Sequence, residues 1–159
     1  MGGWKDRNGL GLDDDIAILA AAPLFQFMAR DALRLLSFAA ERRSLEPGDL
    51  LFARDERADG GFVVLSGTIE LAPRAPGGPS MVAGRSALIG RNALFVRAER
   101  PTDARATSAA EVMRITPTLM RRVLVEFPDA AQAIHDLMAE DLAELTRGLD
   151  EVRTALDAI

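Results

Sequence analysis

The chain has 159 residues, of which 48% are hydrophobic and 27% charged, so it is long enough for one domain with a proper core. It contains no cysteine, which excludes disulfide bonds, thiolate zinc sites and a cysteine nucleophile. The formal net charge of -5 is poorly suited to non-specific nucleic-acid binding, because that binding needs Lys and Arg against phosphates.

The N-terminal 40 residues predict a leader and short helices. Residues 1–12 are polar and rich in glycine, and they predict a flexible leader. Asp13–Asp15 precede a run of good helix formers, which is typical of a helix start. Pro23 interrupts this helix, and later apolar residues predict further short helices that end near Ala40. The leader lacks the apolar core of a signal peptide, and no apolar run approaches the roughly 20 residues that span a bilayer, so we expect a cytoplasmic protein without a membrane partner.

From Glu41 to Ile115 the pattern changes to short apolar or alternating runs divided by Gly, Pro and Asp, which is typical of strands and turns. Strands at this spacing predict a rolled or closed antiparallel sheet. Pro73–Pro79 predicts a long hairpin loop, because proline donates no hydrogen bond to a strand neighbour. The expected strands are 42–45, 50–52, 61–65, 68–71, 81–83, 104–108 and 111–115.

Two helices are expected after the sheet. Thr116 and Pro117 predict a helix start, with a capping hydroxyl followed by proline at the first helical position. Pro128 begins a last helix, residues 128–159, whose apolar residues alternate spacings of four and three in the manner of a coiled-coil seam. The seam either pairs with a second copy in a parallel dimer or packs on the sheet of its own chain. It consists of Met138, Leu142, Leu145, Leu149, Val152, Leu156 and Ile159.

The most specific pattern is Pro-Gly-Asp at 47–49 followed by Gly-Phe-Val-Val-Leu-Ser-Gly at 61–67. Together with the order of helices, rolled sheet and two helices, it resembles the cyclic nucleotide-binding domain family of catabolite-activator-type regulators and kinase regulatory subunits. The resemblance covers about Pro23 to Ile159. It implies an α+β fold: an antiparallel, jelly-roll-like β-roll with N-terminal helices and a long C-terminal helix. The corresponding division is a leader at 1–12, the roll with flanking helices at 13–127 and a dimerisation helix at 128–159.

Members of this family hold their ligand in a phosphate-binding cassette. A Gly-Glu pair opens a short helix, an Ala-Leu pair follows, and an Arg beside a small residue closes the cassette. Amides and the Arg hold the cyclic phosphate, and the Glu accepts from a ribose hydroxyl. The resemblance implies that the following residues bind the ligand here: Gly90, Arg91, Asn92, Ala93, Leu94, Arg100, Pro101 and Thr102.

Two cassette residues depart from the family pattern. Arg91 replaces the Glu, and an arginine accepts no hydrogen bond from a ribose hydroxyl. Pro101 has no N–H to offer a phosphate. Each departure costs on the order of 1–3 kcal/mol of binding free energy.

Three interpretations of the cassette stay open. It binds a cyclic nucleotide with replacement contacts from Thr102 or Asn92. It binds another anion suited to two arginines, such as a more highly phosphorylated nucleotide or an organic acid. It is empty, with Arg91 paired to a structural acid such as Glu99 or Asp103.

The sequence therefore favours a ligand-sensing regulatory domain without enzyme activity, metal or resident cofactor. A small anion is expected at Arg100, Arg91 and the amides after Gly90, with its other end against the long helix near Met138–Leu145. Binding would shift the pairing of that helix in a homodimer and so affect an unidentified protein partner, without direct nucleic-acid binding. The alternatives are a ligand-free dimeric interaction scaffold and the sensor half of a transcription regulator, since family members of that kind carry a helix-turn-helix domain after the long helix.

Overall fold

The computed structural model describes residues 3–158 of the chain. Helices precede and follow a strand-rich middle, as the sequence predicts. The helical elements are α1 (Gly3–Ala21), η1 (Phe25–Phe27), α2 (Arg30–Ala39), η2 (Arg91–Leu94), α3 (Pro117–Glu126) and α4 (Pro128–Asp157). The strands are β1 (Glu41–Leu45), β2 (Leu50–Phe52), β3 (Arg57–Ala58), β4 (Gly61–Ser66), β5 (Ile69–Leu71), β6 (Met81–Ala83), β7 (Leu88–Ile89), β8 (Ala98–Glu99), β9 (Ala104–Ala106) and β10 (Ala110–Ile115).

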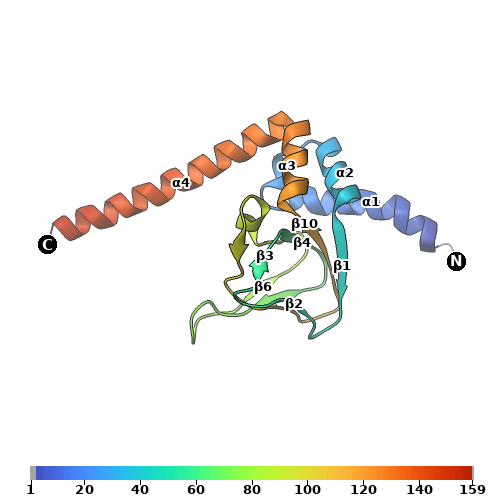
Figure 1. Cartoon of the computed structure of the whole chain (residues 1–159), viewed down its shortest axis with the longest axis horizontal. Coiled ribbons are helices and arrows are strands. Elements are labelled where there is room, and N and C mark those ends of the chain that lie inside the picture. Colours follow the sequence, from blue (N-terminus) through green and yellow to red (C-terminus); the bar gives the residue numbers. More distant parts are fainter. Residues whose placement is uncertain (1–2, 159) are drawn as a thin grey trace.

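The strands form a β-roll, which confirms the predicted α+β fold (Figure 1). One sheet has the order β1-β10-β4-β7, a second has the order β2-β9-β5-β6, and β3 pairs with β8. Every strand pair is antiparallel. The sequence missed β3, β7 and β8, because a strand of two residues is too short to show an alternating pattern.

Strand β4 separates two apolar clusters. Phe62 and Val64 point into the roll, whereas Val63 and Leu65 pack against the helices on the other face. Successive side chains of a strand point to opposite faces, so a strand buried on both sides is apolar throughout. The helices therefore attach to the roll along β4, and Met113 and Ile115 of the neighbouring strand β10 belong to the same cluster.

The three acidic residues 13–15 lie inside α1 and not at its start, which corrects the expected helix boundary. The helix begins at Gly3 and so includes residues 3–12 of the segment expected to be a flexible leader. Asp15 is buried, accepts from Ser37 and pairs with Arg42, while Asp13 pairs with Arg30. These carboxylates join α1 to α2 and β1, which explains them without a helix terminus or a cation.

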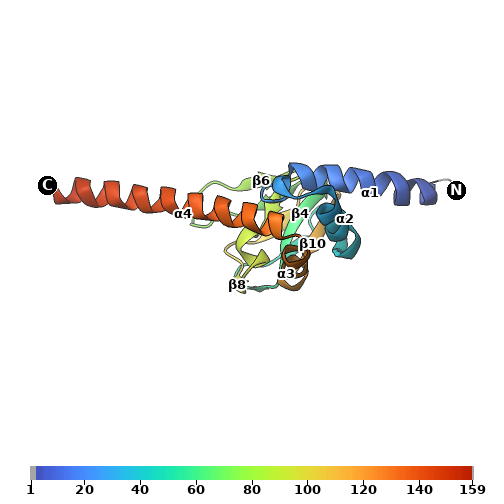
Figure 2. The same cartoon turned by 90° about the horizontal axis from the view of Figure 1, so that it is seen from above.

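The last two helices begin where the sequence predicts. The Thr116 hydroxyl accepts from the Leu119 N–H at 3.2 Å, and proline takes the first position of both α3 and α4. At the start of α4, Ala130 and Ile134 are buried against the other helices. Beyond them α4 runs away from the roll as a single projecting helix (Figures 1 and 2). Each residue lengthens such a helix by about 1.5 Å.

The seam of α4 does not pack on the sheet of its own chain, which removes one of the two interpretations of this helix. Its side chains are exposed by 39% at Met138 and by between 58% and 65% from Leu142 to Leu156. Ile159, the last predicted member of the seam, lies outside the described residues. Within residues 3–158, no helix has the length and apolar character to cross a membrane.

Candidate functional site

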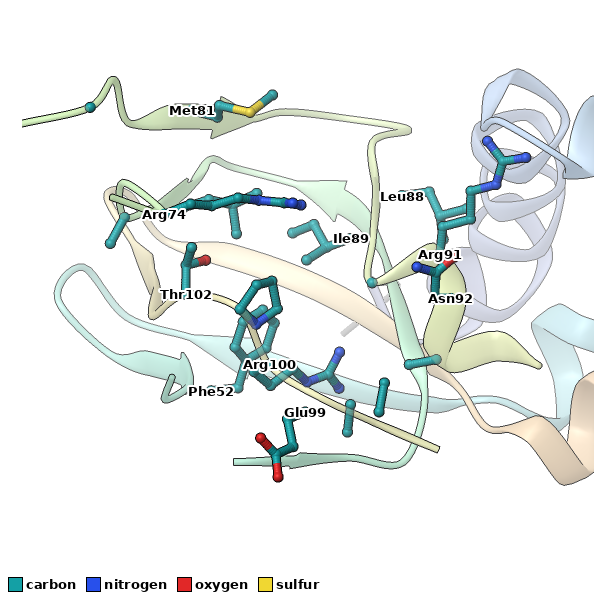
Figure 3. Close-up of a pocket in the computed structure, with 18 of the residues that line it drawn as sticks. Phe52, Arg74, Met81, Leu88, Ile89, Arg91, Asn92, Glu99, Arg100 and Thr102 are labelled. Carbon is teal, nitrogen blue, oxygen red and sulfur yellow. The ribbon is translucent and has the colours of Figure 1, made fainter. Parts of the chain in front are cut away.

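A cavity of about 780 Å³ opens between the roll, the hairpin loop after β5 and the cassette around η2 (Figure 3). Its volume lies within the range of about 300–1,000 Å³ that is typical of small-molecule sites. Apolar side chains form much of its wall, and four charged residues reach it. These charged residues are Arg74, Arg91, Glu99 and Arg100.

Arg100 is the most buried charge of the cavity, with 5% of its surface exposed. Its guanidinium donates a hydrogen bond from Nη2 to the Gly60 carbonyl at 2.7 Å. The same group lies 4.4 Å from the ring centre of Phe52 and 5.3 Å from that of Phe62. Burial lowers the pKa of Arg100, an effect opposed by the nearby charges of Asp59 and Glu56. The guanidinium nevertheless stays protonated, because arginine does not lose its proton in proteins.

The acids near Arg100 have other partners. Asp59 pairs with Arg114 at 3.1 Å, and Glu56 accepts from the Ala53 N–H at 2.9 Å. Arg100 therefore has a carbonyl and two ring faces around it but no carboxylate in ion-pair contact among the described residues. A desolvated cation without a counter-ion is costly, and an anion in the cavity would reduce that cost.

Gly90 gives Arg100 its space. The residue has a φ of 78°, which is the left-handed region that glycine adopts easily. A Cβ at this position would lie 2.6 Å from Nη1 of Arg100. In the turn that follows, the Ala93 N–H donates a hydrogen bond to the Gly90 carbonyl. The amides of Arg91 and Asn92 therefore have no acceptor inside the turn.

Arg91 reaches from the cavity edge to α4. Its Nη2 lies 2.7 Å from the Asp141 carboxylate, so the partner is neither Glu99 nor Asp103, the acids that the sequence suggested. Asp103 instead accepts from the Arg54 N–H at 2.6 Å. Sequence reasoning missed this partner because Asp141 lies 50 residues away on another element. The ion pair joins the cassette to the projecting helix just before Leu142.

The structure brings seven of the eight predicted cassette residues to the cavity. Leu94 is the exception: it is 1% exposed and packs in the cluster between helices and sheet. None of the seam residues from Met138 to Leu156, the part of the seam that the structure describes, lines the cavity, so the expected contact of a ligand with Met138–Leu145 is absent from this arrangement. The cassette residues at the cavity are Gly90, Arg91, Asn92, Ala93, Arg100, Pro101 and Thr102.

Sequence reasoning missed the residues that the roll itself contributes. Arg74 comes from the Pro-rich hairpin loop, and Phe52 and Ile89 come from strands on the roll interior. No local motif marks them, because only the pairing of distant strands brings them to one cavity. The apolar alternation around Ile69 and Leu71 was the single available signal, and it indicated a buried face without indicating a ligand.

The chain belongs to the cyclic nucleotide-binding domain family, whose sequence profile matches residues 42–127. A curated relative, the CRP-like cAMP-activated global transcriptional regulator of Mycobacterium tuberculosis, is 22% identical over 138 residues. That match covers 85% of this chain and 62% of the relative, so the chain spans less than two thirds of that protein. The family is one of regulatory ligand-binding domains and not a class of enzymes.

Solved structures agree with this assignment. The cyclic nucleotide-binding-like protein of Brucella abortus is 38% identical, with a TM-score of 0.63 over 70% of this chain and 98% of that chain. The N-terminal domain of a transcriptional regulator from Streptomyces coelicolor has the same fold, with a TM-score of 0.75 and 24% identity over 83% of this chain and 94% of that one.

Proposed function

We propose that this domain binds a small anionic ligand, in the first place a cyclic nucleotide, with its phosphate at Arg100. The observation that carries the proposal is the burial of this arginine at the cavity without a carboxylate in contact. A phosphate oxygen would accept hydrogen bonds from the guanidinium, and the amides of Arg91 and Asn92 follow Gly90, which lies against that guanidinium. The relative from Mycobacterium tuberculosis, whose name describes it as cAMP-activated, supports a nucleotide as the first candidate.

The sugar contacts differ from the family pattern. Arg91 offers no acceptor for a ribose hydroxyl and is paired with Asp141, while Pro101 offers no N–H. Thr102, 5% exposed, and Asn92 both line the cavity, and their side chains are the candidates for a replacement sugar contact. We therefore expect cAMP to bind more weakly than it does to a cassette with glutamate and a donor N–H, by about 1–3 kcal/mol for each of these two hydrogen bonds.

The output of the domain is its C-terminal helix. We infer that two copies pair in parallel through the seam of α4, because an exposed a/d stripe of this length is the surface that a coiled coil buries. The Arg91–Asp141 ion pair supports a route from cassette to helix, since a ligand that repositions Arg91 changes what holds α4. A ligand that favours one arrangement shifts the population towards it.

The rival function is a ligand-free dimeric scaffold, which the exposed seam alone would fit. An open, cationic cavity favours the sensor, because a scaffold needs no space of 780 Å³ beside a buried arginine. The α4 pair would act on a regulated partner. That partner is either a protein that contacts the pair or a DNA-binding domain, as in transcription regulators of this family.

A thermal-shift series tests the ligand proposal. The purified chain and its Arg100→Gln variant are heated with cAMP, cGMP, cyclic dinucleotides and phosphorylated metabolites at millimolar concentration. A ligand at 100 times its Kd stabilises the folded state by about 2.7 kcal/mol, so a binding compound raises the melting temperature of the wild type measurably. We expect at least one such compound, with the shift reduced or abolished in Arg100→Gln. No shift with any compound would favour the scaffold.

A further inference from the structure

A second cationic side chain reaches the cavity from the hairpin loop between β5 and β6. Arg74 lines the same cavity as Arg100 but comes from a separate part of the roll. Figure 3 shows the Arg74 side chain running along the cavity wall towards Ile89, with Thr102 on the side that faces Arg100. The loop thus presents a guanidinium to a different region of the ligand space from the one that Arg100 serves.

The charges around the cavity leave these two cations available. Arg91 is neutralised by Asp141 at 2.7 Å. Arg74 and Arg100 make no ion pair with any residue of the described chain 3–158, and Figure 3 shows the Glu99 carboxylate turned away from Arg74. The cavity is therefore locally cationic in a chain whose formal net charge is -5.

The wall of the cavity is mostly apolar. Leu71, Ala72 and Ile89 are among the residues that line it, and the buried Thr102 supplies a hydroxyl. Apolar walls with a few placed polar groups are the usual form of a small-molecule site, and the polar groups fix which ligand is accepted. A complementary ligand has an anionic group at each end and a less polar part between them.

We propose that the cavity takes a nucleotide with two separated phosphate groups, one held by Arg100 and the second by Arg74. This inference rests on the proposed function, since it assumes that Arg100 binds the first phosphate. It also accounts for the two departures of the cassette. In the family pattern, the glutamate binds the sugar and the donor N–H binds the cyclic phosphate. A second phosphate held by Arg74 would replace the binding free energy of these two missing hydrogen bonds.

Calorimetric titration of three adenine nucleotides tests the inference. The probes are cAMP, with one phosphate, and adenosine 3′,5′-bisphosphate and cyclic di-AMP, with two phosphates at different separations. We expect at least one two-phosphate probe to bind the wild type about tenfold or more tighter than cAMP, the size of one charge-assisted contact. Arg74→Gln should remove this advantage, with a much smaller loss of affinity for cAMP, which carries no second phosphate.

Arg85→Gln is the matched control, because Arg85 is an exposed arginine beyond β6 that does not line the cavity. This variant removes the same charge as Arg74→Gln and should leave the affinities for all three probes within about twofold of the wild-type values. Equal binding of cAMP and both two-phosphate probes, or an equal loss for all probes in Arg74→Gln, would overturn the role of Arg74 and leave the proposed function intact. Failure of all three probes to bind the wild type would overturn the inference, and the thermal-shift series with cGMP and phosphorylated metabolites would decide the proposed function separately.

Discussion

The β-roll and the outer part of α4 treat their apolar side chains in opposite ways. Along the roll, alternate residues such as Val64 and Ile69 are wholly buried by strands from both sheets. Along α4, the residues spaced by four and three are exposed, and Leu142 and Leu149 are each more than 60% exposed. The roll therefore completes its own core and can hold a precise cavity, whereas the helix presents a surface that only another molecule can cover.

Truncating one buried and one exposed residue gives the largest expected contrast. Ile69→Ala removes a fully buried side chain from the roll and should lower the free energy of unfolding by about 2–5 kcal/mol. Leu149→Ala removes a side chain that is 63% exposed and should change it by no more than about 0.5 kcal/mol in the monomer. Urea denaturation at protein concentrations that keep the chain monomeric measures both. Similar decreases for the two variants would contradict the difference between the regions.

Charges placed in the seam should abolish pairing of α4. The double variant Leu145→Glu, Leu149→Glu introduces four carboxylates into a parallel dimer and should raise its dissociation constant at least about 100-fold. Arg147→Glu, on the same helix but outside the seam, is the control and should have a far smaller effect. Sedimentation equilibrium compares them. A wild type that stays monomeric, or a double variant that still dimerises, would refute the proposed dimer helix.

Two glycine substitutions should have opposite signs. Gly90→Ala places a Cβ on a backbone with a φ of 78° and against the Arg100 guanidinium. It should lower the free energy of unfolding by about 1–3 kcal/mol and weaken nucleotide binding. Gly148→Ala meets nothing within 4 Å on α4 and should stabilise the helix by about 0.5–1 kcal/mol. Thermal denaturation gives both signs. A harmless Gly90→Ala would mean that Arg100 does not depend on this space.

The ion pair between the two regions should give the smallest effect. Arg91 and Asp141 have side chains 39% and 51% exposed, so their coupling energy should lie between about 0.2 and 1 kcal/mol and decrease with added salt. A double-mutant cycle of Arg91→Gln and Asp141→Asn measures it, and the exchange Arg91→Asp with Asp141→Arg should restore most of it. A coupling energy of zero at low salt would remove this link between cassette and helix.

The sequence predicts well whatever local patterns determine. The strands 50–52 and 81–83 match the structure residue for residue. The capping hydroxyl of Thr116, followed by proline at the first helical position, marks the start of α3 correctly. The prediction that residues 1–12 form a flexible leader differs from the structure, in which α1 covers 3–12 in spite of its glycines.

The site is only partly predictable, because local sequence patterns indicate its cassette but not the contacts between distant segments. The cassette residues are adjacent in sequence, and seven of the eight lie at the cavity. The contacts of Arg91 with Asp141 and of Arg100 with Gly60 join residues 50 and 40 positions apart, so only the folded chain determines them. Arg74 reaches the cavity from a hairpin loop, and loop conformation is not encoded by a local period.

The central claim is that an anion at Arg100 changes the pairing of α4. The chain has no cysteine, so Asp150→Cys, on the exposed part of α4, carries one spin label per protomer. Pulsed electron resonance then gives the label-to-label distance with and without millimolar cAMP, in the wild-type and Arg100→Gln backgrounds. We predict a defined distance in the free protein that shifts with cAMP only when Arg100 is present. An absent distance, or one that cAMP leaves unchanged in both backgrounds, would contradict the claim.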